Sequence, residues 1–230
     1  MKSDGDCCQK HFGLKAIDMK SEDECLLSEE IFEIQNNIYN MFKLGTHNSM
    51  TYLTPKCWLL YPFKWMAQCQ SKDIKFQYDL GVRYFDIRVR FDKFGNPEFA
   101  HGIMTYKADV EKTLEELNGF GEEIQIRLLL EVAKKSDDTD RQIALFRECC
   151  SDWVERFKNL KFHCGRMKYN WQVVYEFENP EPAIDQKVSS MVGTKIDDIF
   201  PLLYALFNNR KNLEQGTEKE YMLLDFIEMR

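Results

Sequence analysis

Several features are missing from this 230-residue sequence, and each absence excludes a class of protein. No apolar run is long enough to cross a bilayer, so we expect no membrane-spanning segment. No basic stripe interleaved with aromatic side chains is present, and the formal net charge is −7, which disfavours nucleic acid as a partner. No GxGxxG motif follows the first predicted strand, which argues against a dinucleotide-binding domain.

The eight cysteines include no CxxC pair and show no ligand-like spacing to His163. We therefore expect reduced thiols, several of them buried, and no zinc site. The first residues contain no apolar segment of the kind that a secretion signal needs, so we expect a cytoplasmic protein. A secreted or peripheral membrane location is the alternative. We also expect a monomer.

Repeats, low-complexity segments and long linkers are absent, which predicts one domain over residues 26–230 after a loosely ordered polar segment, residues 1–25. Apolar segments between turn signals predict strands over residues 39–44, 82–91, 98–101, 124–132, 171–177 and 221–226. Helical periodicity predicts helices over residues 64–80, 107–117, 140–157 and 196–213. Pro201 is expected in the first turn of the last helix, or at a bend in it.

Alternating strands and helices indicate a mainly parallel α/β sheet, either doubly wound or closed into a barrel. Polar residues favour the barrel, because barrel enzymes gather catalytic groups at the carboxyl ends of their strands. Polar residues lie within or just after six separate predicted strands: His47, Arg88, His101, Glu131, Glu176 and Asp225.

Two histidines and an arginine at strand ends suit phosphodiester chemistry. One imidazole takes a proton from an attacking hydroxyl, the other gives a proton to the leaving oxygen, and the guanidinium holds the phosphate.

The motifs around these residues are FKLGTHNS at residues 42–49, WMAQCQS at 65–71, GVRYFDIR at 81–88 and FAHG at 99–102. They resemble the catalytic X domain of phosphatidylinositol-specific phospholipase C over about residues 39–135, with a second anchor at residues 223–226. Residues 162–215 are placed by the order of strands and helices alone. The resemblance implies a distorted, incomplete TIM-like (β/α) barrel.

The resemblance also implies a role for each residue. His47 would be the base that deprotonates the inositol hydroxyl beside the phosphate, and His101 the acid for the departing oxygen. Asp225 would orient His47, and Arg88 would hold the phosphoryl oxygens. The product would be a cyclic phosphodiester.

Two positions bear on metal dependence. Arg88 matches the bacterial enzymes that need no metal, so we expect no cofactor. Asn48 instead matches the calcium-dependent enzymes, and Asn48, Asp86 and Glu131 form the alternative calcium site. Asp86 is expected to support His101, or else to pair with Arg83 or Arg90.

Further polar residues are assigned by strand position. Glu131, Glu176 and Asn48 are candidates for binding substrate, and Glu178 shares a predicted strand face with Glu176. Arg127 is expected to point outward into solvent.

These features predict a phosphoric diester hydrolase similar to phosphatidylinositol phospholipase C, with a phosphoinositide or related phosphodiester as substrate. The alternatives are a phosphodiesterase acting on a soluble glycerophosphodiester or cyclic nucleotide signal, and a catalytically silent module that binds a phosphorylated headgroup. The aromatic segment Trp58–Phe63 would give peripheral contact with a membrane, or else form a packed loop.

Overall fold

The computed structural model of the protein describes residues 42–132, 138–169, 172–176, 187–190 and 200–230. The chain divides into two units, Met1–Asn37 and Ile38–Arg230, and all described residues belong to the second. The predicted loosely ordered segment, residues 1–25, lies outside the described residues, so its boundary at residue 26 stays a prediction.

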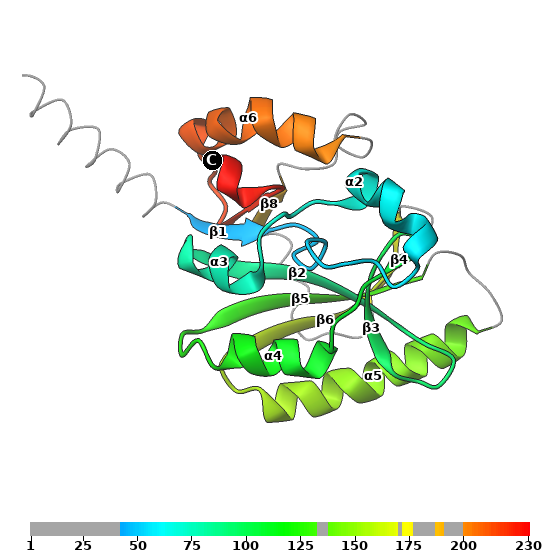
Figure 1. Cartoon of the computed structure of the whole chain (residues 1–230). Coiled ribbons are helices and arrows are strands. Elements are labelled where there is room, and N and C mark those ends of the chain that lie inside the picture. The colour runs from blue at the N-terminus through cyan, green and yellow to red at the C-terminus, as the bar shows by residue number, and fades with distance from the viewer. Residues whose placement is uncertain (1–41, 133–137, 170–171, 177–186, 191–199) are drawn as a thin grey trace, which may run out of the picture. The chain divides into compact units, whose positions relative to one another are not determined.

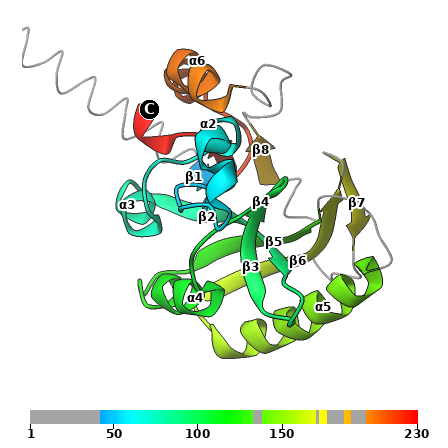
Figure 2. The same ribbon diagram turned by 45° about the vertical axis from the view of Figure 1, so that its right-hand side comes forward.

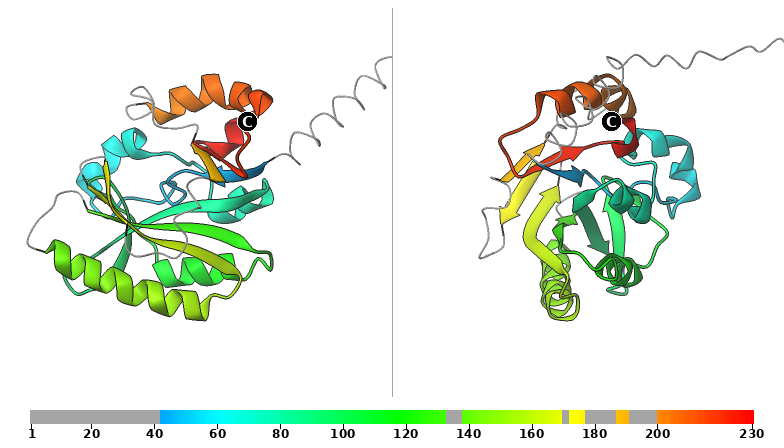
Figure 3. Two further views of the ribbon diagram at one scale, coloured as in Figure 1. Left: turned by 180° about the vertical axis from the view of Figure 1, so that it is seen from behind. Right: turned by 90° about the vertical axis from the view of Figure 1, so that its left-hand side faces the viewer.

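The described strands form one nine-stranded sheet. They are β1 (Lys43–Thr46), β2 (Val82–Phe91), β3 (Pro97–His101), β4 (Met104–Thr105), β5 (Ile124–Glu131), β6 (Leu160–Tyr169), β7 (Gln172–Glu176), β8 (Val188–Ser190) and β9 (Tyr221–Leu224). The order across the sheet is β7-β6-β5-β2-β1-β9-β8, with β3 and β4 branching from β2. The strands β6-β5-β2-β1-β9-β8 are each parallel to the next. Strand β7 is antiparallel to β6, and β3 is antiparallel to β2. The sheet curls, as Figure 3 shows, so the predicted distorted α/β barrel is confirmed as a half-barrel.

The helices are η1 (Trp58–Phe63), α2 (Lys64–Ala67), α3 (Ile74–Asp79), α4 (Val110–Asn118), α5 (Thr139–Arg156), α6 (Pro201–Gln215) and η3 (Ile227–Met229). Figure 1 shows α4 and α5 along the side of the sheet formed by β2, β5 and β6, and α6 near β8. Asp73 and Asp109 cap α3 and α4 by accepting backbone N–H groups of the first turn. Pro201 stands in the first turn of α6, as predicted. In the described part of the chain, no helix has the length and apolar character needed to cross a membrane.

Alternate residues of the central strands face opposite sides of the sheet, because side chains in a strand repeat with a period of two. The side covered by α4 and α5 receives Phe85, Ile87, Val89, Ile124, Ile126, Leu128 and Leu130, which join Leu114, Leu117, Phe146 and Trp153 in the main core. On the concave side, Tyr84 packs against Tyr221 and Leu223. Asp86 and Arg88 follow Tyr84 on this concave face toward the carboxyl end of β2. The strand period thus places polar chemistry on one face and the core on the other.

Several predicted boundaries were wrong. The predicted helix over residues 64–80 is two short helices, because the N–H groups of Cys69 and Gln70 donate to Thr51 Oγ1 instead of to helical carbonyls. The first strand begins at Lys43 and extends to Thr46, since it pairs with β2 and β9 over that range. Strands β4, β6 and β8 were not predicted, and Figure 2 shows β4 beside β3 in front of the sheet. The ends of the predicted strand at residues 171 and 177, and the predicted helix start at residue 196, lie outside the described residues.

Candidate active site

His47 directly follows β1 at the carboxyl end of the sheet, and hydrogen bonds hold its backbone there. His47 N donates to Leu224 O at 3.1 Å, which ties the end of β1 to the end of β9. The side chain of Gln70 donates to both His47 O (3.1 Å) and Leu224 O (2.8 Å). These bonds bring His47 next to Asp225, which follows β9.

The protonation pattern of the His47 imidazole follows from its neighbours. His47 Nδ1 lies 2.9 Å from Asp225 Oδ1. Arg88 Nη2, at 2.8 Å, and Asn48 Nδ2, at 3.2 Å, both lie against His47 Nε2. Because both of these groups are donors, we assign the lone pair to Nε2 and the proton to Nδ1, which donates to Asp225. His47 is therefore oriented as a base whose Nε2 lone pair faces Arg88.

Arg88 joins two carboxylates on the concave face. Its Nε and Nη2 donate to Asp86 Oδ2 at 3.2 and 3.1 Å, and its Nη1 donates to Glu131 Oε2 at 3.0 Å. Burial opposes the charged forms of Asp86 and Arg88, but their mutual attraction and the charges of Arg127 and Glu131 outweigh it. The pKa of Asp86 is therefore held well below its usual value, and the pKa of Arg88 is raised above its usual value.

His101, the last residue of β3, lies on the other side of the same guanidinium. Its Nδ1 is 3.3 Å from Arg88 Nη1 and 3.7 Å from Glu131 Oε2. The second oxygen of Glu131 accepts the N–H of Gly102 at 2.8 Å, which fixes the carboxylate beside the imidazole. Arg88 thus lies between two imidazoles, each within hydrogen-bonding reach of one of its terminal nitrogens.

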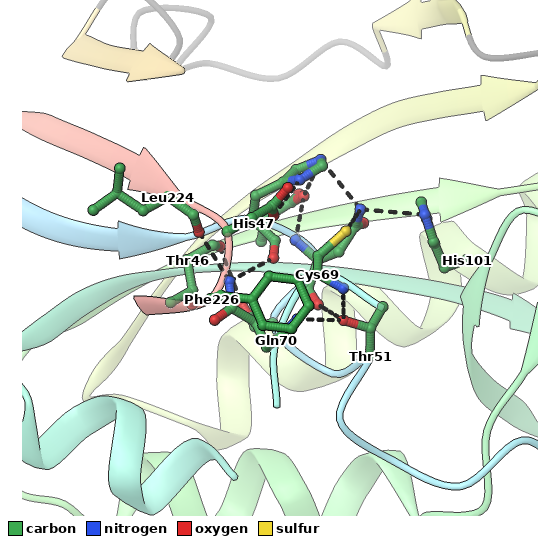
Figure 4. Close-up of polar contacts among 12 residues, drawn as sticks. Thr46, His47, Thr51, Cys69, Gln70, His101, Leu224 and Phe226 are labelled. Atoms are coloured by element: carbon green, nitrogen blue, oxygen red, sulfur yellow. Dashed lines mark hydrogen bonds and ion pairs between the residues drawn. The ribbon is translucent and has the colours of Figure 1, made fainter. Parts of the chain in front are cut away.

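Asn48 occupies the turn after His47 with a positive φ of 45°, a conformation that asparagine adopts more readily than most residues. Its backbone N–H donates to Asp86 Oδ2 at 3.1 Å. Its Nδ2 lies 3.2 Å from His47 Nε2 and 3.5 Å from His101 Nε2. The Asn48 amide is therefore a second group that lies against both imidazoles, those of His47 and His101, which Figure 4 labels.

The structure brings together seven of the predicted site residues: His47, Asn48, Asp86, Arg88, His101, Glu131 and Asp225. Glu176 is different, since it ends β7, which is separated from β2 by β6 and β5 in the sheet order. Glu178 lies outside the described residues. Two members of the alternative calcium set, Asp86 and Glu131, each accept hydrogen bonds from Arg88 through one carboxylate oxygen.

Two expectations about arginines were wrong. Arg127 does not point outward, since its side chain is 17% exposed and its Nη1 lies 3.4 Å from Asp86 Oδ1. Arg83 pairs with Glu122, and Arg90 donates to a backbone oxygen, so neither is the partner expected for Asp86. His163, by contrast, is a buried histidine outside this network, with Nε2 2.6 Å from Gln125 Oε1.

Sequence reasoning missed the residues that support His47. Thr51 Oγ1 accepts the backbone N–H groups of Cys69 and Gln70 at 2.9 and 3.0 Å. Gln70 Oε1 also accepts Ile227 N at 3.2 Å, in addition to the bonds that its amide donates. Gln70 is fully buried in the structure, and its place inside the WMAQCQS motif was the signal that the sequence offered.

A cavity of about 780 Å³ opens elsewhere, at the amino ends of the strands. Its lining includes Lys43, Gln125, Leu160 and Tyr221, each at or next to the start of a strand. Catalytic groups of barrel enzymes gather at the opposite, carboxyl end. The chemistry-bearing residues of this chain lie there as well, so this cavity is not the candidate active site.

An exposed apolar surface spans η1, α2 and α6. Its members are Trp58, Leu59, Tyr61, Phe63, Trp65, Met66, Phe200, Leu202, Leu203, Leu206 and Phe207. Trp65 stacks on Phe200 with ring centroids 5.9 Å apart, which joins the two halves of this surface. The segment Trp58–Phe63 is a 3₁₀ helix without a buried residue, and its Leu60 packs against the core while its aromatic side chains are exposed.

No protein-family model and no curated protein sequence matches the chain. Among solved structures, the phosphatidylinositol-specific phospholipase C of Listeria monocytogenes is 16% identical with a TM-score of 0.51, covering 80% of this chain and 87% of its own. A double mutant of the Staphylococcus aureus phosphatidylinositol-specific phospholipase C is also 16% identical with a TM-score of 0.51, covering 80% and 84%. At this identity the likeness is one of fold alone. The chain therefore shares its fold with these bacterial phospholipase C structures.

Proposed function

We propose that the protein cleaves a phosphodiester by intramolecular attack, with His47 as the base and His101 as the acid. The observation that carries the proposal is the position of Arg88, which lies 2.8 Å from one imidazole and 3.3 Å from the other. A phosphoryl group held by this guanidinium would have an imidazole on each side, as the transfer of two protons requires. The likeness to phosphatidylinositol-specific phospholipases C supports this choice of chemistry.

In the first step, His47 Nε2 takes the proton of a substrate hydroxyl beside the phosphate, and the hydroxyl oxygen forms a bond to phosphorus. The bond from phosphorus to the leaving oxygen breaks, and His101 gives that oxygen a proton. A hydroxyl tethered next to phosphorus already has a high effective concentration, so orientation and proton transfer are the main tasks of the protein. Water can then open the cyclic product with the two histidines in exchanged roles.

The charged residues next to the two histidines support His47 as the base and His101 as the acid. Asp225, 2.9 Å from His47 Nδ1, stabilises the imidazolium that forms when His47 takes the proton. Glu131, 3.7 Å from His101 Nδ1, attracts the proton that an acid must carry. Arg88 would stabilise the negative charge of the five-coordinate transition state, an effect typically worth a few kcal/mol of the barrier.

The reaction as proposed needs no metal cofactor. Arg88 supplies a permanent positive charge next to the phosphate position, which is the role that a dication plays in calcium-dependent chemistry. Asp86 and Glu131 neutralise this cation at 3.1 and 3.0 Å, and a calcium ion held by the same carboxylates would be repelled by it.

We propose a lipid substrate, phosphatidylinositol or a related phosphodiester, presented at a membrane surface. The exposed apolar surface supports this, since Trp58 and Phe207 are 78% and 74% exposed. Tryptophan, tyrosine and phenylalanine side chains partition into the interfacial region of a bilayer. At a formal net charge of −7, attachment would depend on these apolar groups more than on electrostatic attraction.

The acid and base roles are tested by His47→Ala and His101→Ala, with His163→Gln as a matched control, because the His163 side chain lies against Gln125 and, among the residues that the structure describes, takes no part in the hydrogen bonds that join Arg88 to the two site histidines. We expect each site variant to lose at least 10²-fold in turnover and the control to lose little. Binding of a phosphorylated headgroup should persist in both site variants. Activity retained by His47→Ala would contradict the proposal. If wild type and the control also showed no turnover while headgroup binding was intact, the silent binding module would be favoured.

The lipid substrate is tested by comparing vesicles that contain phosphatidylinositol with a soluble glycerophosphodiester. Trp58→Ser should lower cleavage in vesicles without lowering cleavage of a soluble substrate. Phe94→Ser is the matched control, because Phe94 is 76% exposed in the turn between β2 and β3, away from the apolar surface. Turnover of the soluble substrate alone would favour the soluble-substrate alternative.

A further inference from the structure

Three side chains from separate segments place different metal-binding atoms close together beside the candidate active site. A nitrogen of His47, the sulfur of Cys69 and a carboxylate oxygen of Asp225 all lie within 4.8 Å of one another. Figure 4 shows His47 and Cys69 next to each other where the chain leaves β1. The cysteine has no role in the proposed proton transfers, so the cluster calls for a separate explanation.

The donor set selects a particular class of metal. Calcium and magnesium prefer oxygen ligands, whereas one sulfur, one imidazole nitrogen and one carboxylate oxygen suit zinc and similar divalent transition metals. Zinc bonds of about 2.0–2.3 Å place tetrahedral ligands roughly 3.5 Å apart, so shifts of about 1 Å would complete the site. A three-ligand site of this kind leaves a fourth position for water.

Hydrogen bonds hold the backbone of all three ligands. Cys69 N donates to Thr51 Oγ1 at 2.9 Å, and Cys69 O accepts the N–H of Phe226, the neighbour of Asp225, at 2.6 Å. His47 O accepts from the Gln70 amide at 3.1 Å. The three ligands are therefore held near one another without a metal, which reduces the ordering that binding requires.

Charge and access are also compatible with a dication. The carboxylates of Asp86 and Glu131 pair with guanidinium groups, whereas the carboxylate of Asp225 pairs with the His47 imidazole and contributes a negative charge to the cluster. Ionisation of Cys69 adds a second negative charge, and Asn48 Nδ2 already donates to its sulfur at 3.2 Å. His47 is 18% exposed while Cys69 and Asp225 are buried, so a metal would enter past the imidazole.

We propose that His47, Cys69 and Asp225 form an inhibitory site for zinc or a similar divalent transition metal. On binding, the Cys69 thiol releases its proton to solvent, and the metal takes the single lone pair of the neutral imidazole, which breaks the hydrogen bond that Arg88 Nη2 donates to His47. Whichever imidazole nitrogen coordinates the metal, the other one then carries the proton. His47 therefore cannot accept a proton from substrate. The inhibition rests on the proposed function, whereas metal binding does not.

Binding is measured with cobalt(II) as a spectroscopic probe on the full chain, by its near-ultraviolet sulfur-to-metal absorption, and by displacement with zinc. Cys69→Ser is compared with Cys57→Ser, which removes an exposed cysteine outside the cluster. Wild type and Cys57→Ser should show the band, and Cys69→Ser should lose it and bind zinc at least tenfold more weakly. Cys69→Ala gives a second test if the serine variant is misfolded by circular dichroism. An undiminished band in folded Cys69 variants would overturn the site.

Inhibition is measured on a phosphodiester substrate over a zinc titration, each variant relative to its own metal-free rate. Zinc should inhibit wild type and Cys57→Ser reversibly, and the inhibition constant of Cys69→Ser should be at least tenfold higher. Zinc binding without inhibition would overturn the regulatory part of the proposal. A cobalt band that depends on Cys69 in a protein without any phosphodiesterase activity would leave the metal site standing and refute the proposed function instead.

Discussion

Replacing Arg88 with alanine tests whether the concave face of the sheet holds a buried ion network. The substitution removes donors at 3.1 Å from Asp86 and 3.0 Å from Glu131, and leaves both carboxylates buried. Removal of one partner from a buried, hydrogen-bonded pair typically destabilises a protein by about 3–5 kcal/mol. Because Arg127 still neutralises part of the charge of Asp86 at 3.4 Å, we expect a loss of about 3 kcal/mol.

Equilibrium unfolding in urea measures this loss, and a thermal melt should show a midpoint lower by roughly 6–12 °C for a domain of this size. Arg83→Ala is the matched control on the same strand. Its partner Glu122 is 60% exposed, so we expect a loss of about 1 kcal/mol or less. If Arg88→Ala lost no more stability than Arg83→Ala, the buried network described here would be wrong.

Three further predictions test the base, the ion pair and the sheet. Asp225→Asn should lower kcat roughly 10²- to 10⁴-fold with little change in KM, because the Asp225 carboxylate orients His47 and stabilises its imidazolium; steady-state kinetics measures this, and an unchanged kcat would refute the role. Since the pKa of Asp86 is depressed in the folded protein, its ionised form stabilises the fold above about pH 4, the unfolded value, and this contribution is lost as the pH falls further. The difference in unfolding free energy between wild type and Asp86→Asn, measured by urea unfolding, should therefore become smaller below about pH 4. A difference that grows there would contradict a lowered pKa of Asp86 in the folded protein. Gly45→Ala should destabilise the protein by about 1–3 kcal/mol in the same assay, since the added Cβ would lie 2.9 Å from Leu223 Cδ1 and 3.2 Å from Tyr84 Cβ, and a neutral result would mean that these side chains move aside without cost.

The central strands were predictable from sequence because the pattern within them is local. Strand β2 matches its predicted range of residues 82–91, since turn residues bound it and its apolar residues are buried on both faces. Its polar members, Asp86 and Arg88, differ by two positions and so share a face. On β5, Arg127 and Glu131 are four residues apart and therefore share a face of the sheet in the same way. The expected outward direction of Arg127 was wrong because the curl of the sheet decides which face is enclosed.

The supporting residues were harder to predict because their partners are distant in sequence. Gln70 bonds to the backbone of Leu224, which is 154 positions away, and the hydroxyl of Thr51 that interrupts the expected helix lies 18 and 19 positions from Cys69 and Gln70. The spacing argument about cysteines considered neighbours along the chain. It therefore could not reveal Cys69 beside Asp225, since tertiary structure alone brings these two residues together.

The central claim is that two imidazoles and a guanidinium cleave a phosphodiester through a cyclic product without a metal. Phosphorus NMR of phosphatidylinositol vesicles, incubated with the protein in the presence of a calcium chelator, tests it most directly. The account predicts the resonance of a five-membered cyclic inositol phosphate from wild type and its absence from His47→Ala. A cyclic product that forms only when calcium is restored, or a first product that is already the open monoester, would contradict it.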